Sequence, residues 1–172
     1  MVAATAAHPG EAEQTLVIDL AFPPETGQAE FSRADVVIQG LDHSQISYEV
    51  RLFLNSPSAT ADTPRTAEHG YAGRVTVFGH GGCYGDPGHC EVPPPSTDPT
   101  DLRPPHPLTP LDTYVTITDA LRSVLQRDGA LRSLTLVPVS TPPVRTERKP
   151  APELLRFDDV SLRTYLGAPD PG

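Results

Sequence analysis

The sequence has no tryptophan, one methionine, two cysteines and few lysines. Two cysteines are too few for a secreted scaffold held together by many disulfides. A net charge of -9 argues against a surface for nucleic acids or anionic membranes, because phosphates are bound by lysine and arginine. No apolar run approaches the roughly 20 residues of a membrane span. MVAATAAHPGEAEQ lacks the basic and apolar regions of a secretory signal, so we expect a cytoplasmic protein, or one exported together with a partner.

Proline and glycine are abundant, with 21 and 13 of the 172 residues. Proline interrupts helices and central strands, so we expect short elements. The chain is long enough to bury one hydrophobic core. We expect a flexible N-terminal arm over residues 1–13, a single domain over 14–166 and a C-terminal tail over 167–172.

Short apolar runs with period two predict strands. In the clearest, ISYEVRLFLN, Tyr48, Val50 and Leu52 share one face, and in YAGRVTVFG we expect Tyr71 to share a face with Val75 and Val77. The last run keeps its period only with a bulge at Asp158–Asp159. The predicted strands cover residues 15–22, 34–40, 46–55, 71–79, 113–117, 131–140 and 157–166.

One helix is predicted over ITDALRSVLQRDG. It should span about residues 118–128, with Thr116 or Thr118 as N-cap and Gly129 after its C-terminus. Residues 56–70 form a polar connection, and 92–110 a proline-rich strap pinned on the domain surface. The expected fold is all-β, an antiparallel β-sandwich of about seven strands with one short α-helix.

The segment GHGGCYGDPGHCEV carries both cysteines and two of the six histidines. Asp-Pro-Gly at 86–88 predicts a turn that folds the segment back on itself. That turn would bring Cys83 and Cys90 to disulfide distance, or gather them with His89 and His80 around one metal ion. Thiolate with imidazole suits copper(I) or zinc. A disulfide or structural thiols, a transferable copper site and a tight structural metal site all stay open.

Five segments, taken in order, resemble a known domain. The segments are ISYEVRLFLN, HGYAGRVTVFGHG (with the small pair Ala72–Gly73 and with His80 after the strand), YVTITDALRSVL, SLTLVPVS and LLRFDDVSLRTY. Together they cover roughly residues 44–166. They resemble the C-terminal β-sandwich of plant polyphenol oxidases, hemocyanins and other type-3 copper proteins. The family's helical domain, which holds the two coppers, has no counterpart here.

The histidines do not supply a dicopper site of this chain's own. In the family several of the six ligands come from helices, at spacings that place two rings on one face. Here His8, His43, His69 and His106 fall in the arm, in loops or turns and in the strap. No nucleophile elbow, phosphate-binding loop or dinucleotide fingerprint is found. We therefore expect no catalytic residues and no enzyme activity of the chain alone.

The resemblance implies a stand-alone sandwich that acts on a type-3 copper oxidase core of the tyrosinase or polyphenol oxidase kind. The chain would shield the dicopper site, assist assembly or deliver copper, with copper as the cofactor and the oxidase core as the partner. The segment 79–92 is called the cysteine loop. Its aromatic residue, Tyr84, would enter the partner's phenol pocket and block it. The alternatives are a free-standing metal-binding or structural sandwich and the pocket-shaping subunit of a split phenol oxidase. The substrate and the oligomeric state stay open.

Overall fold

The computed structural model describes residues 5–9 (main chain only), 15–22, 30–81, 86, 88–94, 96–103, 106–140 and 154–166. Most of the regular structure in these residues is strand, as the sequence predicts. The strands are β1 Thr5–Pro9, β2 Leu16–Phe22, β3 Arg33–Leu41, β4 Tyr48–Leu54, β5 Tyr71–Val77, β6 Leu111–Thr116, β7 Leu131–Ser140 and β8 Asp159–Tyr165. The helices are α1, Thr118–Asp128, and a single 3₁₀ turn, Ala67–His69.

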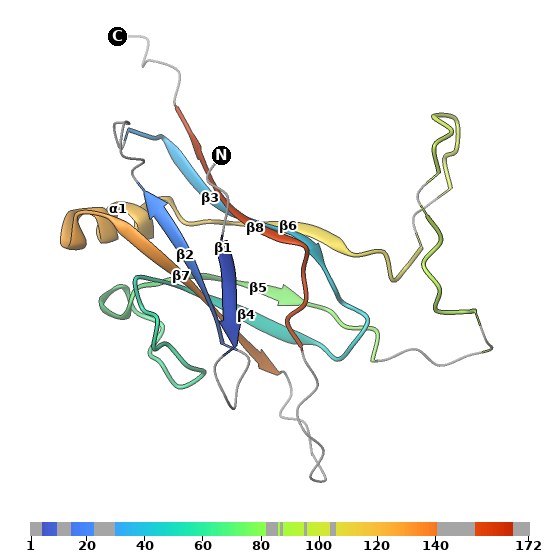
Figure 1. Cartoon of the computed structure of the whole chain (residues 1–172), viewed down its shortest axis with the longest axis horizontal. Coiled ribbons are helices and arrows are strands. Elements are labelled where there is room, and N and C mark those ends of the chain that lie inside the picture. Colours follow the sequence, from blue (N-terminus) through green and yellow to red (C-terminus); the bar gives the residue numbers. More distant parts are fainter. Residues whose placement is uncertain are drawn as a thin grey trace.

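The strands form two antiparallel sheets that pack face to face (Figure 1). One sheet has the order β1-β2-β7-β4-β5, and the other has the order β6-β3-β8. Because β3 and β8 join the same sheet although they lie far apart in the sequence, the fold closes only when the last strand is in place. The predicted all-β sandwich with one short helix is confirmed.

The core between the sheets follows from side-chain alternation. Val50 and Leu52 of β4 point inward, as do Val36 and Ile38 of β3, and all four are fully buried. Burying such a side chain contributes about 1.5–3 kcal/mol, so these strand faces are the main source of stability. The predicted inward face of β4 is confirmed.

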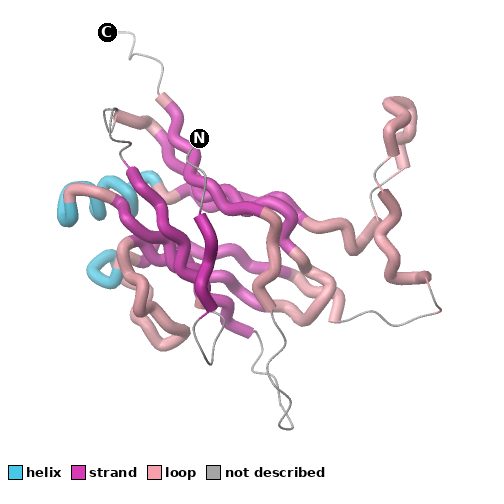
Figure 2. Tube along the Cα trace, viewed as in Figure 1, coloured by secondary structure: helices cyan, strands magenta, loops and turns pink. Residues whose placement is uncertain are grey.

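Helix α1 closes one end of the sandwich, here called the helix end. Figure 2 shows both helical segments gathered there. Leu121 and Val124 are buried in the core, and Gly129 ends the helix in the left-handed region (φ 76°), as predicted. The N-cap prediction is wrong: the N-cap is Ile117, and the Thr118 hydroxyl instead accepts a hydrogen bond from the Ala34 N–H (3.0 Å). The Thr118 hydroxyl therefore bonds the main chain of β3 instead of capping the helix.

A second, smaller apolar cluster lies on the outer face of the five-stranded sheet. Phe53, Ala59 and Val137 are buried in it, and the Tyr71 ring packs edge-on to Phe53 with 5.5 Å between centroids. Ala59 comes from the 56–70 connection, which therefore covers this face. The predicted shared face of Tyr71 and Val75 is wrong, because the β4–β5 register shifts between Gly73 and Tyr71 and turns Tyr71 outward.

Strand β8 pairs with β3 in unbroken register from Asp159 to Tyr165. Asp158 precedes the strand, and its N–H donates to the carbonyl of Gln39 (2.9 Å), which is also the register partner of Asp159, so both residues of the predicted bulge lie opposite one residue of β3. The strand begins two residues later than predicted and keeps its period, with Val160 and Leu162 buried. The carboxylate of Asp158 occupies the space where a Cβ of residue 40 would lie, and Gly40 has φ 65°.

Two further expectations differ from the structure. Residues 1–13, expected as a flexible arm, contain β1, which pairs antiparallel with β2. An otherwise unpaired edge of β2 offers main-chain groups that favour such pairing. The strap, expected on the domain surface, instead extends away from the sandwich as part of the long connection between β5 and β6 (Figure 1). Most of its described side chains are exposed, because it offers little apolar surface to bury.

Candidate functional site

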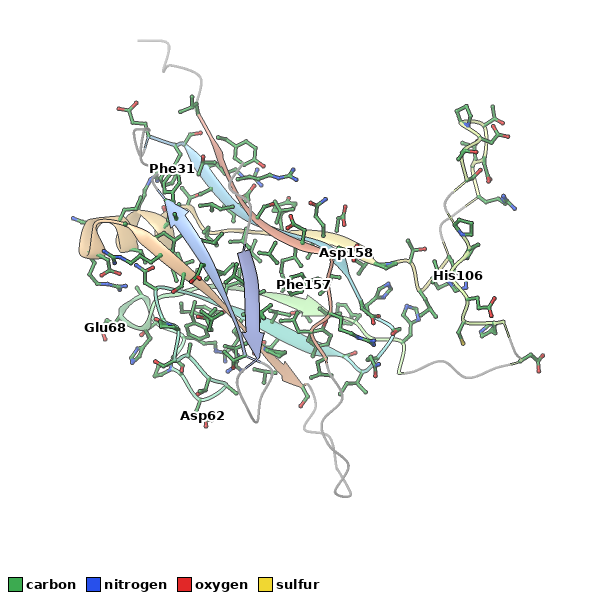
Figure 3. All side chains as sticks on the ribbon, viewed as in Figure 1. Phe31, Asp62, Glu68, His106, Phe157 and Asp158 are labelled. Atoms are coloured by element: carbon green, nitrogen blue, oxygen red, sulfur yellow. The ribbon has the colours of Figure 1, made fainter. Side chains whose placement is uncertain are left out.

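The end of the sandwich opposite α1, here called the loop end, is formed by residues 41–48, 77–81, 109–111 and 154–159. Figure 3 shows Phe157 and Asp158 near this end, Phe31 near α1, and His106 on the projecting connection. Polar contacts hold the loop end together. The Asp42 carboxylate accepts from the Ser44 N–H (2.8 Å) and pairs with Arg156 (2.9 Å), and the Tyr48 hydroxyl donates to the Asp42 carbonyl (3.2 Å).

Two ionisable groups of this network have shifted pKa values. Burial raises the pKa of Tyr48 to about 12, with a further rise from the charge of Asp42. Burial alone would raise the pKa of Asp42, but the hydrogen bonds from Ser44 and the nearby charge of Arg156 outweigh it and lower that pKa. Near neutral pH the network therefore contains an ionised Asp42 and a neutral Tyr48.

His43 and His80 meet at the loop end. Their ring centroids are 5.0 Å apart with an interplanar angle of 60°, and the His80 N–H donates to the His43 carbonyl (3.1 Å). His43 is 6% exposed, whereas His80 is exposed. The sequence indicates only a loop residue at His43, because its neighbours along the chain carry no ligand pattern. The β5 end and the turn after β3 bring the two rings together.

Gly79 allows this close approach. A Cβ at that position would collide with the main chain of Gln45 and Ile46. The Gly79 N–H donates to the Ser47 hydroxyl (3.1 Å), and the Gly81 N–H donates to the Gln45 carbonyl (2.8 Å). The segment that carries His80 is thereby fixed against the turn that carries His43.

The predicted metal ligands are only partly described. His89 is exposed, and its N–H donates to the Asp86 carbonyl (3.0 Å), which fits the predicted turn. Cys90 is disulfide-bonded. Cys83, the other cysteine of the sequence, and Tyr84 lie outside the described residues. Within the described ranges, no group of three or more His, Cys, Asp and Glu side chains is arranged to hold a metal ion.

The remaining described histidines make local contacts. The His69 ring lies 2.9 Å from the Thr66 hydroxyl in the 3₁₀ turn, and His106 Nδ1 accepts from the Leu108 N–H (3.2 Å). Both fit the predicted turn and strap positions. His8 lies in β1, where the structure describes the main chain alone.

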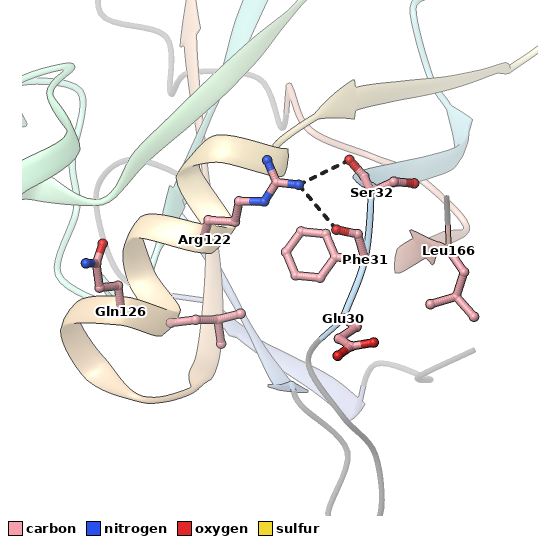
Figure 4. Close-up of a pocket in the computed structure, with 7 residues that line it drawn as sticks. Glu30, Phe31, Ser32, Arg122, Gln126 and Leu166 are labelled. Carbon is pink, nitrogen blue, oxygen red and sulfur yellow. Dashed lines mark hydrogen bonds between the residues drawn. The ribbon is translucent and has the colours of Figure 1, made fainter. Parts of the chain in front are cut away.

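A shallow pocket of about 650 Å³ lies at the helix end (Figure 4). Arg122 crosses it, donates to the Phe31 carbonyl (3.2 Å), and stacks over the Phe31 ring at 5.5 Å. Its guanidinium is therefore already engaged by this chain. The pocket is lined by Glu30, Phe31, Ser32, Arg122, Leu125, Gln126 and Leu166. This lining offers an apolar wall but no paired acid and base for catalysis.

The outer face of the three-stranded sheet carries an ion pair with one buried partner, which sequence reasoning missed. Asp35 is buried and pairs with Arg33 (2.8 Å), while the Thr116 hydroxyl donates to Asp35 (2.9 Å). The Arg33 guanidinium lies over the rings of Tyr114 and Tyr165, at 5.3 and 5.6 Å. Arg33 and Asp35 lie two residues apart on β3, and the register with β6 and β8 adds Thr116 and the two tyrosines to the cluster. It braces the sheet rather than forming a cavity.

Neither helical segment in the described part of the chain is long and apolar enough to cross a membrane. The chain matches no model of a known protein family, and no curated protein is similar to it in sequence.

Proposed function

We propose that this chain is an accessory subunit that covers the dicopper site of a type-3 copper oxidase of the tyrosinase or polyphenol oxidase kind. The fold supports the proposal. The five segments that resemble the terminal sandwich of those oxidases fall on β4, on β5, on β6 with α1, on β7, and on β8 with the residues before it. The resemblance thus follows the elements of the sandwich rather than its loops.

The observation that carries the proposal is the distribution of exposed apolar side chains. Phe78 is 79% exposed at the loop end, and Leu102 is 91% exposed on the projecting connection. Val92 on the same connection and Leu111 at the start of β6 are exposed as well. Exposed apolar side chains spaced along one segment offer contact points for another protein. The connection therefore supplies the contact surface for the oxidase core.

The cysteine loop lies at the start of this connection, next to Phe78. Tyr84 there is a phenol, so it can enter a phenol pocket and keep substrate out. Burying such an aromatic ring contributes roughly 1.5–3 kcal/mol, which shifts a closed state about tenfold to a hundredfold. In the reduced protein the two cysteines, with His89 and His80, would form the copper(I) site through which the subunit delivers metal.

Binding to a dicopper core that lacks a terminal sandwich of its own tests the proposal. We expect a complex by calorimetry and slower phenol oxidation when the chain is added. Phe78→Ser should weaken binding at least tenfold, because it removes an exposed apolar contact. Leu166→Ser is the matched control, because Leu166 is equally exposed but lies at the helix end. Equal weakening by both variants, or no complex, would refute the proposal.

Two further variants separate the roles of the cysteine loop. Tyr84→Ala should keep the complex but restore phenol turnover. Cys83→Ser should abolish copper(I) transfer from the reduced chain to an apo core, with little change in binding. The chain alone, loaded with copper, should not oxidise catechol faster than free copper does.

A further inference from the structure

The His43 ring is held in one orientation and one tautomer. Its Nε2 lies 2.8 Å from the Thr109 carbonyl oxygen. A carbonyl only accepts, so Nε2 carries the proton and Nδ1 of the neutral ring keeps its lone pair. This is the arrangement of metal-binding histidines, whose second ring nitrogen donates to a carbonyl or a carboxylate.

The free nitrogen of His43 has no competing partner. Among the described residues, none makes a hydrogen bond to Nδ1, and every fully buried side-chain nitrogen or oxygen has a hydrogen-bond partner. The residue as a whole is 6% exposed. The nearby Asp42 carboxylate is already engaged by Ser44 and Arg156. The lone pair of His43 is left for an external ligand.

His80 supplies a second imidazole at a suitable separation. Imidazole nitrogens bind copper or zinc at about 2.0–2.1 Å, so two rings in neighbouring positions on one ion, square-planar or tetrahedral, have centroids about 4.5–5 Å apart. The observed separation is 5.0 Å. His80 is exposed, and its ring makes no hydrogen bond to any described residue. An ion can therefore enter from the solvent side of the pair.

We propose that His43 and His80 bind one copper(II) ion at the loop end. Imidazole suits copper and zinc, and copper(II) binds most tightly among the divalent first-row metals. The net charge of -9 favours the approach of a cation. Two ligands from the chain leave the other coordination positions to water or to a group of another molecule, so the ion is exchangeable.

This site shares His80 with the copper(I) site of the cysteine loop but uses His43, and no cysteine, as its other ligand. It needs neither thiolate nor a reduced protein, because both of its ligands are imidazoles of a preformed contact. It also does not rest on the proposed function, since it belongs to the free chain. A failure to bind an oxidase core would leave it standing, and a failure to bind copper(II) would leave the covering role standing.

The test is copper(II) titration of the oxidised, full-length chain, with pulsed electron paramagnetic resonance to count imidazoles bound to the ion. We expect one equivalent with two imidazoles in the wild type. His80→Ala should leave one imidazole and weaken binding at least tenfold. Because His80 is exposed, this variant should fold normally, which its melting temperature checks. Lowering the pH to about 5 should release the ion, since imidazole binds metal only when neutral.

His69→Ala is the matched control, because His69 is also exposed but lies in the 3₁₀ turn at the helix end. It should bind copper(II) as the wild type does, and so should the Cys83→Ser/Cys90→Ser double variant. His43→Gln should retain the fold better than alanine and still lose one imidazole. Wild-type affinity in His80→Ala, or a single imidazole in the wild type, would overturn the inference. Loss of binding only in the double serine variant would assign the ion to the cysteine loop instead.

Discussion

The two ends of the sandwich are closed in different ways. At the helix end, the apolar stripe of α1 enters the core, and Leu121 and Val124 are buried there. At the loop end, directional polar contacts among Asp42, Tyr48 and Arg156 close the sandwich, and the buried ring of His43 meets the exposed ring of His80 there. Apolar burial stabilises the fold but does not orient polar side chains. Polar contacts cost more desolvation free energy to form, but they hold the side chains that make them in fixed orientations. Apolar burial therefore closes the helix end, and oriented polar contacts close the loop end.

The largest expected effect is at the helix end. Leu121→Ala removes a fully buried side chain and leaves a cavity, which should lower the free energy of unfolding by about 2–5 kcal/mol. Leu125→Ala is the control, because Leu125 is only partly buried on the same helix. Urea denaturation followed by circular dichroism measures both. Equal losses would show that α1 is not anchored through Leu121.

Asn55 links the helix end to β7. Its side chain donates to Asp128 (2.9 Å) and to the Ala130 carbonyl (2.8 Å), and accepts from the Arg132 N–H (2.7 Å). Its φ is 52°, in the left-handed region. Asn55→Ala should cost about 2–3 kcal/mol, from the lost hydrogen bonds and the strained backbone.

Asn55→Gly separates the two contributions, because glycine adopts this backbone without strain but makes none of the hydrogen bonds. It should therefore be less destabilising than Asn55→Ala in the same denaturation experiment. If the two variants are equally stable, the backbone at residue 55 contributes nothing.

At the loop end, the effect of Tyr48 should depend on pH. Burial raises its pKa to about 12, above the value of about 10 in the unfolded chain. The folded state therefore holds the proton more tightly, and this stability is fully present below about pH 10 and lost as the pH rises toward 12. Tyr48→Phe should flatten this alkaline decline and cost about 0.5–1.5 kcal/mol at neutral pH. Tyr114→Phe, at an exposed tyrosine, should keep the wild-type pH profile.

The smallest expected effect concerns the ion pair between Arg156 and Asp42. Both side chains are partly exposed, so Arg156→Met should change the free energy of unfolding by less than about 1 kcal/mol. The change should shrink further in high salt, because exposed charges are screened. A loss of unfolding free energy as large as that of Leu121→Ala would contradict the idea that polar contacts at the loop end stabilise less than apolar burial at the helix end.

The sequence predicts the regular elements well, because their signals are local. Alternation in ISYEVRLFLN and in TLVIDLAF identifies β4 and β2, and the apolar stripe with Gly129 identifies α1 and its C-terminus. The errors occur where a distant segment intervenes. Thr118 does not cap the helix, because its hydroxyl accepts a hydrogen bond from the Ala34 N–H. Tyr71 faces outward, because the β4–β5 register shifts beside it.

The candidate sites also differ in whether their signal in the sequence is local. The spacing of Cys83 and Cys90 around an Asp-Pro-Gly turn is visible in the sequence, and it leaves a disulfide and a metal site equally open. The pairing of His43 with His80 has no local signature, because the two residues come from different turns. The ion pair of Asp35 with Arg33 is local, because the two residues alternate on β3, but the tyrosines that stack on Arg33 lie on two other strands.

Composition and periodicity by themselves determined the all-β class, the strand faces, the single helix and the proline-rich connection, because each depends on neighbours within a few residues. The tertiary structure alone decided which side chains meet across the sheets and at the two ends. Register and strand order are global properties, fixed by how both layers bury their apolar faces together. The loop end acquires its paired imidazoles only through that packing.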